Sequence, residues 1–126
     1  MQKEYINVPA GKKAGPPLTS AIKCGETLYV SGQTPMDLHT GKFIEGDIAT
    51  QTRQVLENIK MVLNECGSKL EDVVKVVVYL TDLNDFAAFN EVYKEYFKEP
   101  YPVRTLLGAK LLFTFNVEID VTARLN

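Results

Sequence analysis

Residues 117–125 alternate between apolar and polar side chains, and this alternation limits the possible folds more than any other feature of the chain. A period of two is typical of a β-strand with one buried face and one wetter face. The segment therefore predicts a strand in a sheet that is covered on one side. The apolar positions are Val117, Ile119, Val121, Ala123 and Leu125, and the polar positions are Glu118, Asp120, Thr122 and Arg124.

A second strand is predicted just upstream, around Arg104. This arginine follows Pro102 by two positions and has a β-branched neighbour on each side, and proline suits the first position of a strand. If the two strands share a sheet, we expect Arg104 and Glu118 to project to the same side. The guanidinium could then hold a substrate carboxylate through two parallel N–H groups, and the glutamate could orient water or move a proton. A structural salt bridge between the two residues is the alternative.

The clearest helix is predicted between Asp47, a good N-cap residue, and Gly67, a residue that often ends helices in the left-handed conformation. Side chains at helical spacing form a stripe that is expected to pack on the sheet. These residues are Ile48, Thr52, Val55, Leu56, Ile59, Val62, Leu63 and Cys66. Polar side chains such as Arg53 and Lys60 lie on the opposite face and are expected to stay in water.

The segment 73–80, VVKVVVYL, is apolar on both faces and predicts a central strand. A second helix is expected after a cap in residues 81–85, with an aromatic stripe along it: Phe86, Phe89, Tyr93 and Phe97. Asn90 shares part of this stripe. A partly buried amide needs hydrogen-bond partners, so Asn90 is predicted either to cap a neighbouring loop or to border a pocket.

The N-terminal part predicts an arm followed by a hairpin. Residues 1–17 contain Gly11, Gly15, Pro16 and Pro17, which are expected to prevent regular structure. Two strand-like runs follow, at residues 18–24 and 27–32, with Gly25–Glu26 fitting a two-residue turn. Gly32 indicates a bulge or a close backbone approach, and the hydroxyl of Ser31 is a candidate ligand contact. An ordinary strand end is the other interpretation of these two residues.

These elements predict one domain over residues 1–126, an α+β sandwich with one sheet and two helices on one face. Two helices leave the other face of the sheet bare. Because large exposed apolar patches usually mark association, we expect a symmetric oligomer with ligand clefts between subunits.

Charge and composition argue against several classes of function. The net charge is −2 and the pI about 5.4, so there is no basic field to attract nucleic acid; Lys12–Lys13 is expected to flank a solvated loop. No run reaches the roughly twenty apolar residues of a membrane span, and the N-terminus lacks the pattern of a signal peptide, which predicts a cytoplasmic protein. Cys24, Cys66 and the only histidine, His39, form no metal-binding or redox spacing.

Several separated segments resemble the RidA/YjgF/UK114 family, also called L-PSP. They are GPPLTSAIKCGETLYVSGQTPMD at 15–37, the segment from GDIATQ to KEYF at 46–97, PVRT at 102–105 and VEIDVTA at 117–123. The resemblance covers almost the whole chain in the same order. It implies a chorismate-mutase-like fold with a mixed sheet, and a homotrimer with a barrel-like core.

The resemblance also implies an activity without a metal or organic cofactor. Active members hydrolyse reactive enamines and imines, such as 2-aminoacrylate, to 2-keto acids and ammonia, as 2-iminobutanoate/2-iminopropanoate deaminases. By this resemblance Arg104 holds the substrate carboxylate and Glu118 positions the attacking water. Ser31 and Gly32 line the cleft, and Asn90 falls on another pocket position.

The sequence departs from the family pattern at three places. The Gly-Pro-Tyr of active members is Gly15-Pro16-Pro17, which removes a cleft hydroxyl that Tyr101 is one candidate to replace. The cysteine common two positions after the arginine is Leu106. The usual Arg-Leu-Pro is Lys110-Leu111-Leu112, and two phenylalanines follow, which predicts a differently shaped and more apolar loop.

Two other functions stay open at this point. Loss of the tyrosine at Pro17 is compatible with a non-catalytic protein that binds 2-keto acids or related metabolites. The older family label of translation inhibitor or ribonuclease is opposed by the acidic charge balance and by the single histidine.

Overall fold

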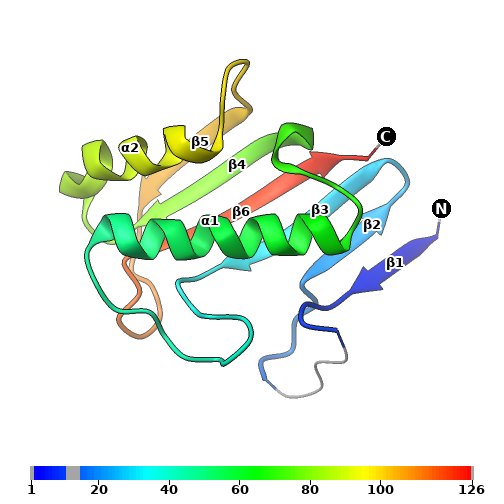
Figure 1. Ribbon diagram of the computed structural model, residues 1–126, viewed down its shortest axis with the longest axis horizontal. Helices are drawn as coiled ribbons and strands as arrows, with labels where there is room; N and C mark the ends of the chain where they lie inside the picture. Colours follow the sequence, from blue (N-terminus) through cyan, green and yellow to red (C-terminus); the bar gives the residue numbers. More distant parts are fainter. Residues whose placement is uncertain (1, 11–14, 126) are drawn as a thin grey trace.

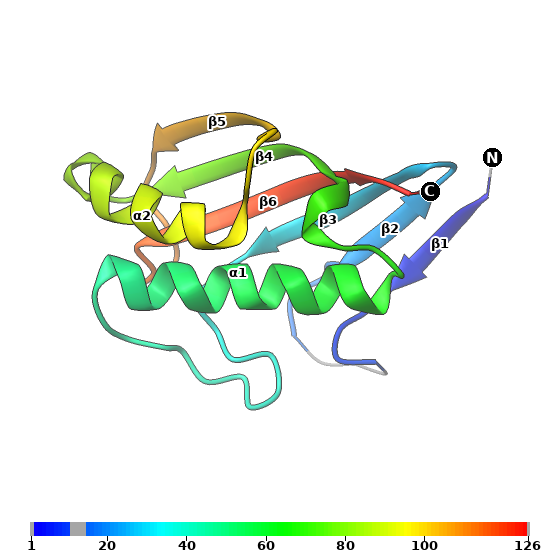
Figure 2. The same cartoon turned by 45° about the horizontal axis from the view of Figure 1, so that its top comes forward.

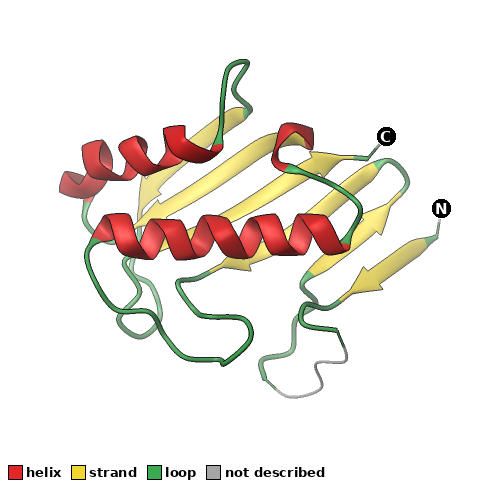
Figure 3. Cartoon of the chain, viewed as in Figure 1, coloured by secondary structure: helices red, strands yellow, loops and turns green. Residues whose placement is uncertain are grey.

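The computed structural model describes residues 2–10 and 15–125 as one sheet with two helices packed on the same face (Figures 1 and 3). This is the predicted α+β sandwich. The expectations for Gly11 and for Lys12–Lys13 lie outside the described residues. Among the described residues, no helix combines the length and the apolar character needed to cross a bilayer.

The sheet contains six strands, and two 3-10 turns accompany the two helices. The strands are β1 (Lys3–Ile6), β2 (Ala21–Cys24), β3 (Thr27–Gln33), β4 (Val73–Leu80), β5 (Val103–Gly108) and β6 (Val117–Arg124). The helices are α1 (Ile48–Glu65) and α2 (Phe86–Tyr96), and the 3-10 turns are η1 (Leu70–Asp72) and η2 (Leu83–Asp85).

The strand order is β1-β2-β3-β6-β4-β5, so the last strand of the chain is inserted into the middle of the sheet. β6 pairs antiparallel with both β3 and β4, whereas β4 and β5 are parallel and are connected through α2. The sheet is therefore mixed. Figure 2 shows α1 crossing one side of the strands, with α2 beside it over the β4–β5 edge.

Both predicted ends of α1 are confirmed. The Asp47 side chain accepts a hydrogen bond from the backbone N–H of Thr50 at 2.9 Å, and Gly67 has a φ of +73°, the left-handed conformation that favours glycine. The predicted stripe is buried against the sheet. Its fully buried apolar members are Val55, Leu56, Ile59, Val62 and Leu63. Across from them lie the buried odd-numbered side chains of β6, from Val117 to Ala123.

The prediction that residues 1–17 lack regular structure is wrong for part of this segment. β1 pairs antiparallel with β2, with Tyr5 opposite Ile22. The strand was missed because it is short, mostly exposed and rich in charged residues, so its pattern is weak. A buried contact anchors the chain after it: the N–H of Val8 donates to the Ser20 hydroxyl at 3.0 Å.

The predicted bare face of the sheet is present in this chain. β4 buries Val76 and Val78 against the helices, while its alternate side chains, including Val77 and Tyr79, point to the open face and are only half-buried. Other apolar side chains on this face are more exposed. They are Tyr29 (54% exposed), Val103 (67%) and Leu107 (41%). A patch of this kind commonly marks an interface, so the expected oligomer stays a prediction with a physical basis.

Two buried amides on α1 hold the loops that enter and leave the middle of the sheet. Asn58 donates to the carbonyls of Thr34 and Met36, at 3.1 and 2.7 Å, just after β3. Gln51 accepts from the N–H of Asn116 at 2.9 Å, just before β6. These side chains therefore fix the backbone immediately after Gly32 and immediately before Glu118. The sequence analysis overlooked both amides, although a polar residue within an apolar stripe is the signal that could have identified them.

We expect Asn58→Ala to lower the free energy of unfolding by about 1–3 kcal/mol, because two partly buried carbonyls lose their donor. Urea denaturation followed by circular dichroism measures this change. Asn64→Ala, at an exposed position of the same helix, is the control and is expected to change the free energy by less than about 0.5 kcal/mol. Equal effects of the two substitutions would contradict the anchoring role of Asn58.

Candidate functional site

Arg104 is held in one orientation by α2. Its Nη1 donates to the Oδ1 of Asn90 at 2.9 Å, and its guanidinium carbon lies 4.8 Å from the ring centre of Tyr93. Phe89 and Phe86 lie at 5.9 and 6.0 Å. A cation over an aromatic ring is attracted by the electrons of the ring face, and the hydrogen bond fixes the rotation of the guanidinium plane. Asn90 is thus a partner of Arg104. Of its two predicted roles, the structure bears out the position at the border of a pocket.

A cavity of about 410 Å³ opens in front of this arginine. Its lining residues come from α2 and from the segment leading into β5: Asn90, Tyr93, Lys94, Tyr101, Pro102 and Arg104. The cavity therefore combines a fixed cation with aromatic and apolar walls. Tyr101, the candidate replacement for the missing family tyrosine, lies in this cavity, while Pro17 lies on the surface.

Tyr93 is the most buried side chain of this cavity, at 5% exposure. Burial raises the pKa of its hydroxyl to about 12, although the positive charge of Arg104 acts in the opposite direction. Tyr93 therefore remains a neutral phenol beside the cation throughout the physiological pH range. The sequence analysis assigned Tyr93 to the packing stripe and did not anticipate its contact with Arg104.

Glu118 lies on the open face of the sheet, together with Gly32, Asp120 and Tyr79. Tyr79 is its neighbour across the β4–β6 ladder, and the hydroxyl of Tyr79 donates to Asp120 at 3.2 Å. Partial burial, and secondly the negative charge of Asp120, raise the pKa of the Glu118 carboxyl above its usual value. A carboxyl group with a raised pKa is suited to accepting and returning a proton.

The expectation that Arg104 and Glu118 project to the same side is wrong within one chain. The two strands share the sheet, but β4 lies between them. Arg104 is paired with Val76, whose side chain is buried under the helices, and Glu118 is paired with Tyr79 on the open face. Because side chains alternate along a strand, these pairings send the two groups to opposite faces. The same geometry rules out the alternative of a salt bridge between them within the chain.

Ser31 and Gly32 form the predicted bulge. Between the pairs Val30–Val121 and Gln33–Ile119, the two residues lie opposite one residue of β6, Asp120. The hydroxyl of Ser31 donates to the carbonyl of Thr19 at 2.5 Å, so its proton is engaged in a hydrogen bond within the chain. Ser31 and Gly32 therefore lie near Glu118 and not near Arg104.

The loop between β5 and β6, which departs from the family pattern, exposes an aromatic cluster. Phe113 has a φ of +54°, is 70% exposed, and its ring centre lies 4.9 Å from that of Phe43 and 5.6 Å from that of Phe115. This agrees with the predicted apolar loop. Leu106, at the position of the family cysteine, faces the helices and packs against the core.

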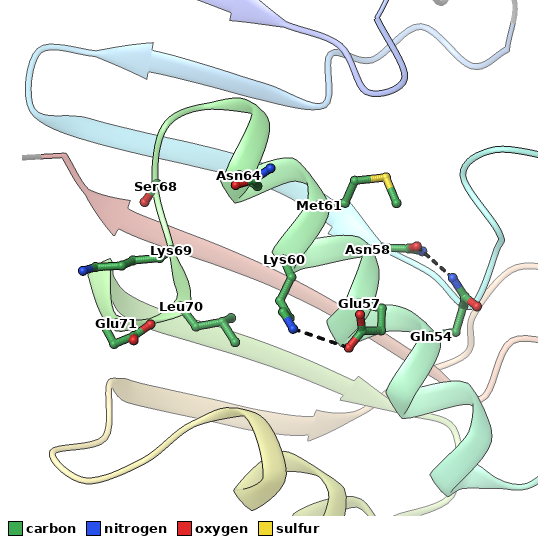
Figure 4. A pocket seen from close by; sticks show the side chains of 10 residues that line it. All are labelled: Gln54, Glu57, Asn58, Lys60, Met61, Asn64, Ser68, Lys69, Leu70 and Glu71. Atoms are coloured by element: carbon green, nitrogen blue, oxygen red, sulfur yellow. Dashed lines mark hydrogen bonds and ion pairs between the residues drawn. The ribbon is translucent and has the colours of Figure 1, made fainter.

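Another cavity, of about 430 Å³, runs along the outer side of α1 (Figure 4). It contains the ion pair between Lys60 and Glu57 at 3.8 Å and the hydrogen bond from Gln54 to Asn58 at 2.9 Å. None of the candidate site residues lines it. In the described part of the chain, no three His, Cys, Asp or Glu side chains form a group that could hold a metal ion, and His39 lies in an exposed turn.

Fold and side chains together define a small α+β protein with a fixed arginine on one face of its sheet and a half-buried carboxyl group on the other. Residues 11–125 match the family model described as Endoribonuclease L-PSP. The chain therefore belongs to the RidA/YjgF/UK114 (L-PSP) family.

Individual relatives agree with this assignment over most of their length. A RutC family protein of Pyrococcus abyssi is 53% identical over 112 residues, which cover 89% of this chain and 88% of the relative. The 2-iminobutanoate/2-iminopropanoate deaminase of Dermatophagoides farinae is 37% identical over 119 residues, or 94% of this chain and 93% of the relative. The crystal structure of RidA from an Antarctic Psychrobacter superimposes with a TM-score of 0.89 at 38% identity, covering 97% and 99% of the two chains.

We expect an NMR titration to give a pKa for Glu118 above that of an ordinary glutamate. Asp120→Asn should reduce this shift without removing it, since burial is the larger cause. A raised pKa means that the folded chain favours the protonated form, so the stabilisation is complete in acid and is lost as the pH rises through the folded-state pKa. Glu118→Gln should therefore gain stability relative to the wild type between acid and neutral pH. An ordinary pKa for Glu118 would contradict its burial on the open face.

Proposed function

We propose that this protein hydrolyses small 2-imino acids and their enamine tautomers to 2-keto acids and ammonia. The observation that carries the proposal is the guanidinium of Arg104, which is fixed by Asn90 and Tyr93 at the wall of a 410 Å³ cavity. A hydrogen bond to Asn90 occupies one N–H of the guanidinium and leaves other donors for a ligand. A planar acceptor with two oxygens, such as a carboxylate, is the natural ligand for such a group.

The chemistry needs a water molecule and a group that moves protons. The water oxygen bonds to the imine carbon while the C=N π electrons move to nitrogen, and a base takes the proton from the water. The nitrogen takes up one proton to give the carbinolamine and then a second proton, which makes it a leaving group. The carbinolamine hydroxyl loses its proton and forms the C=O of the keto acid as the C–N bond breaks and ammonia departs. We assign the base and acid roles to Glu118, whose raised pKa suits both directions of transfer. Orientation of the substrate supplies a further part of the rate.

Because Arg104 and Glu118 lie on opposite faces of one chain, the proposed site takes one residue from each of two subunits. Arg104 of one subunit would hold the carboxylate, and the partner subunit's Glu118 would position the water. The exposed apolar side chains of the open face supply a surface for this association. A cyclic homotrimer with a barrel-like core, the arrangement implied by the family resemblance, repeats such a site three times.

The deaminase name of the Dermatophagoides relative supports the reaction, because the alignment with that protein covers 94% of this chain. The ribonuclease in the family description fits the residues less well, because the chain has a net charge of −2 and a single histidine in an exposed turn.

Arg104→Ala is expected to lower kcat/KM for keto-acid release from an alanine-derived imine by at least about 100-fold, because the carboxylate loses its charged partner. Lys94→Ala is the matched control. Lys94 lines the same cavity but is exposed and paired with Glu91, so its loss should change kcat/KM by less than about threefold. An Arg104→Ala protein with the wild-type rate would remove the arginine from the mechanism.

Calorimetry with pyruvate separates the enzyme from a non-catalytic keto-acid-binding protein, the alternative raised by Pro17. The enzyme binds pyruvate and also releases keto acid from the imine. Binding through Arg104 without turnover in the wild type would select the binding protein.

Mixing two strongly impaired variants tests whether the site is shared. If each site takes its arginine and its glutamate from different subunits, then random reassembly of equal amounts of Arg104→Ala and Glu118→Gln chains restores about a quarter of the sites. Refolding from denaturant and an activity assay measure the recovery, with each variant refolded alone as the control. Complete lack of recovery in properly assembled mixed oligomers would contradict a site shared between subunits.

A further inference from the structure

Gly32 does not have the positive φ angle that commonly explains a glycine. Positive φ angles occur at Gly15, Gly25, Gly41, Gly46 and Gly67, but not at Gly32. The residue lies in β3, and its φ is outside the left-handed region that favours glycine, so backbone conformation of that kind does not require a glycine here. Its lack of a side chain must therefore be explained by what surrounds it.

The surrounding group is the carboxyl of Glu118. A Cβ atom added to Gly32 would lie 2.3 Å from Oε2 of Glu118, 3.1 Å from its Cδ and 3.4 Å from its Cγ. Real Cβ atoms do not approach other atoms to 2.3 Å, so a side chain at position 32 and the present position of the carboxyl group exclude each other. All three nearest atoms belong to Glu118, and none belongs to the backbone.

The bulge in β3 creates this contact. Ser31 and Gly32 together face Asp120, so the strand has one residue more than its partner at this point. The extra residue turns Gly32 toward the open face, where Glu118 also projects. Asn58 fixes the backbone just beyond the bulge, and Gln51 fixes the backbone just before Glu118, so neither strand can easily move away.

We infer that Gly32 is a positioning residue for Glu118: the space left by its missing side chain is where the Glu118 carboxyl group rests against β3. This inference rests on the proposed function for its catalytic consequence. It differs from a direct role of the Gly32 backbone in binding substrate, because it predicts that Gly32 matters only while Glu118 is present.

Gly32→Ala tests the inference because the clashing atoms belong to the far end of a flexible side chain. The fold should survive, with little change in the denaturation midpoint, and the carboxyl group should move. Gly108→Ala is the matched control: Gly108 also lies in a strand without a positive φ, and the three atoms nearest to its added Cβ all belong to Leu83, at an ordinary 3.4 to 3.5 Å.

Three measurements are expected to distinguish the positioning of Glu118 by Gly32 from a direct role of the Gly32 backbone in substrate binding. A crystal structure of Gly32→Ala should show the Glu118 carboxyl displaced by more than about 1 Å from its wild-type position, while Gly108→Ala leaves it in place. In the deaminase assay kcat should fall by about tenfold or more, with KM changed by less than about twofold because the Arg104 that holds the carboxylate belongs to the other subunit and is unchanged. In a Glu118→Ala background, Gly32→Ala should cause no further fall beyond about twofold.

The inference is overturned if the carboxyl group stays in place in Gly32→Ala, or if Gly32→Ala lowers kcat equally with and without Glu118. A failure of the proposed function has a different signature, namely a wild-type protein that does not hydrolyse imines. In that case the crystal structures of Gly32→Ala and Gly108→Ala still decide whether Gly32 sets the position of Glu118.

Discussion

The insertion of β6 between β3 and β4 determines how the rest of this molecule is arranged. Its strict alternation places one set of side chains under the helices and the other set on the open face. A shift of one residue in this strand would bury Glu118 and Asp120 in the core and expose Val117 and Ile119. Because burial of unpaired carboxylates is so unfavourable, the register of the central strand is strongly specified. The positions of Arg104 and Glu118 on opposite faces of the sheet follow from this register.

Much of the fold could be predicted from the sequence because its main signals are local. The caps at Asp47 and Gly67, the apolar stripe of α1 and the alternation in β6 depend on residues close together in the chain. β1 could not be predicted, since an exposed edge strand with a charged sequence has neither a buried face nor a turn to mark it. Strand order was also out of reach, because pairing between distant strands leaves little trace in a single sequence.

The candidate site, like the fold, could be predicted only in part from the sequence. Arg104, Glu118, Gly32 and Asn90 were each predicted as candidates from the sequence, and at Gly32 the structure contains the predicted bulge and a close approach. The prediction that Arg104 and Glu118 project to the same side was wrong. It would have required their strands to be adjacent, whereas β4 lies between β5 and β6. The structure instead forms two groups, one around Arg104 and one around Glu118. Tyr93 was seen only as a core residue, since no sequence pattern distinguishes packing under a cation from packing in general.

The immobilisation of Arg104 has a thermodynamic consequence for any anion that binds in its cavity. A free arginine side chain loses about 0.5–1.5 kcal/mol of conformational entropy when a ligand fixes it. Here Asn90 and Tyr93 have already restricted its rotamers during folding. A ligand therefore binds to a side chain that is already ordered. Less of the Coulombic attraction is then offset by conformational entropy lost on binding. The ordering of Arg104 during folding therefore favours the binding of small acids over neutral molecules of the same shape.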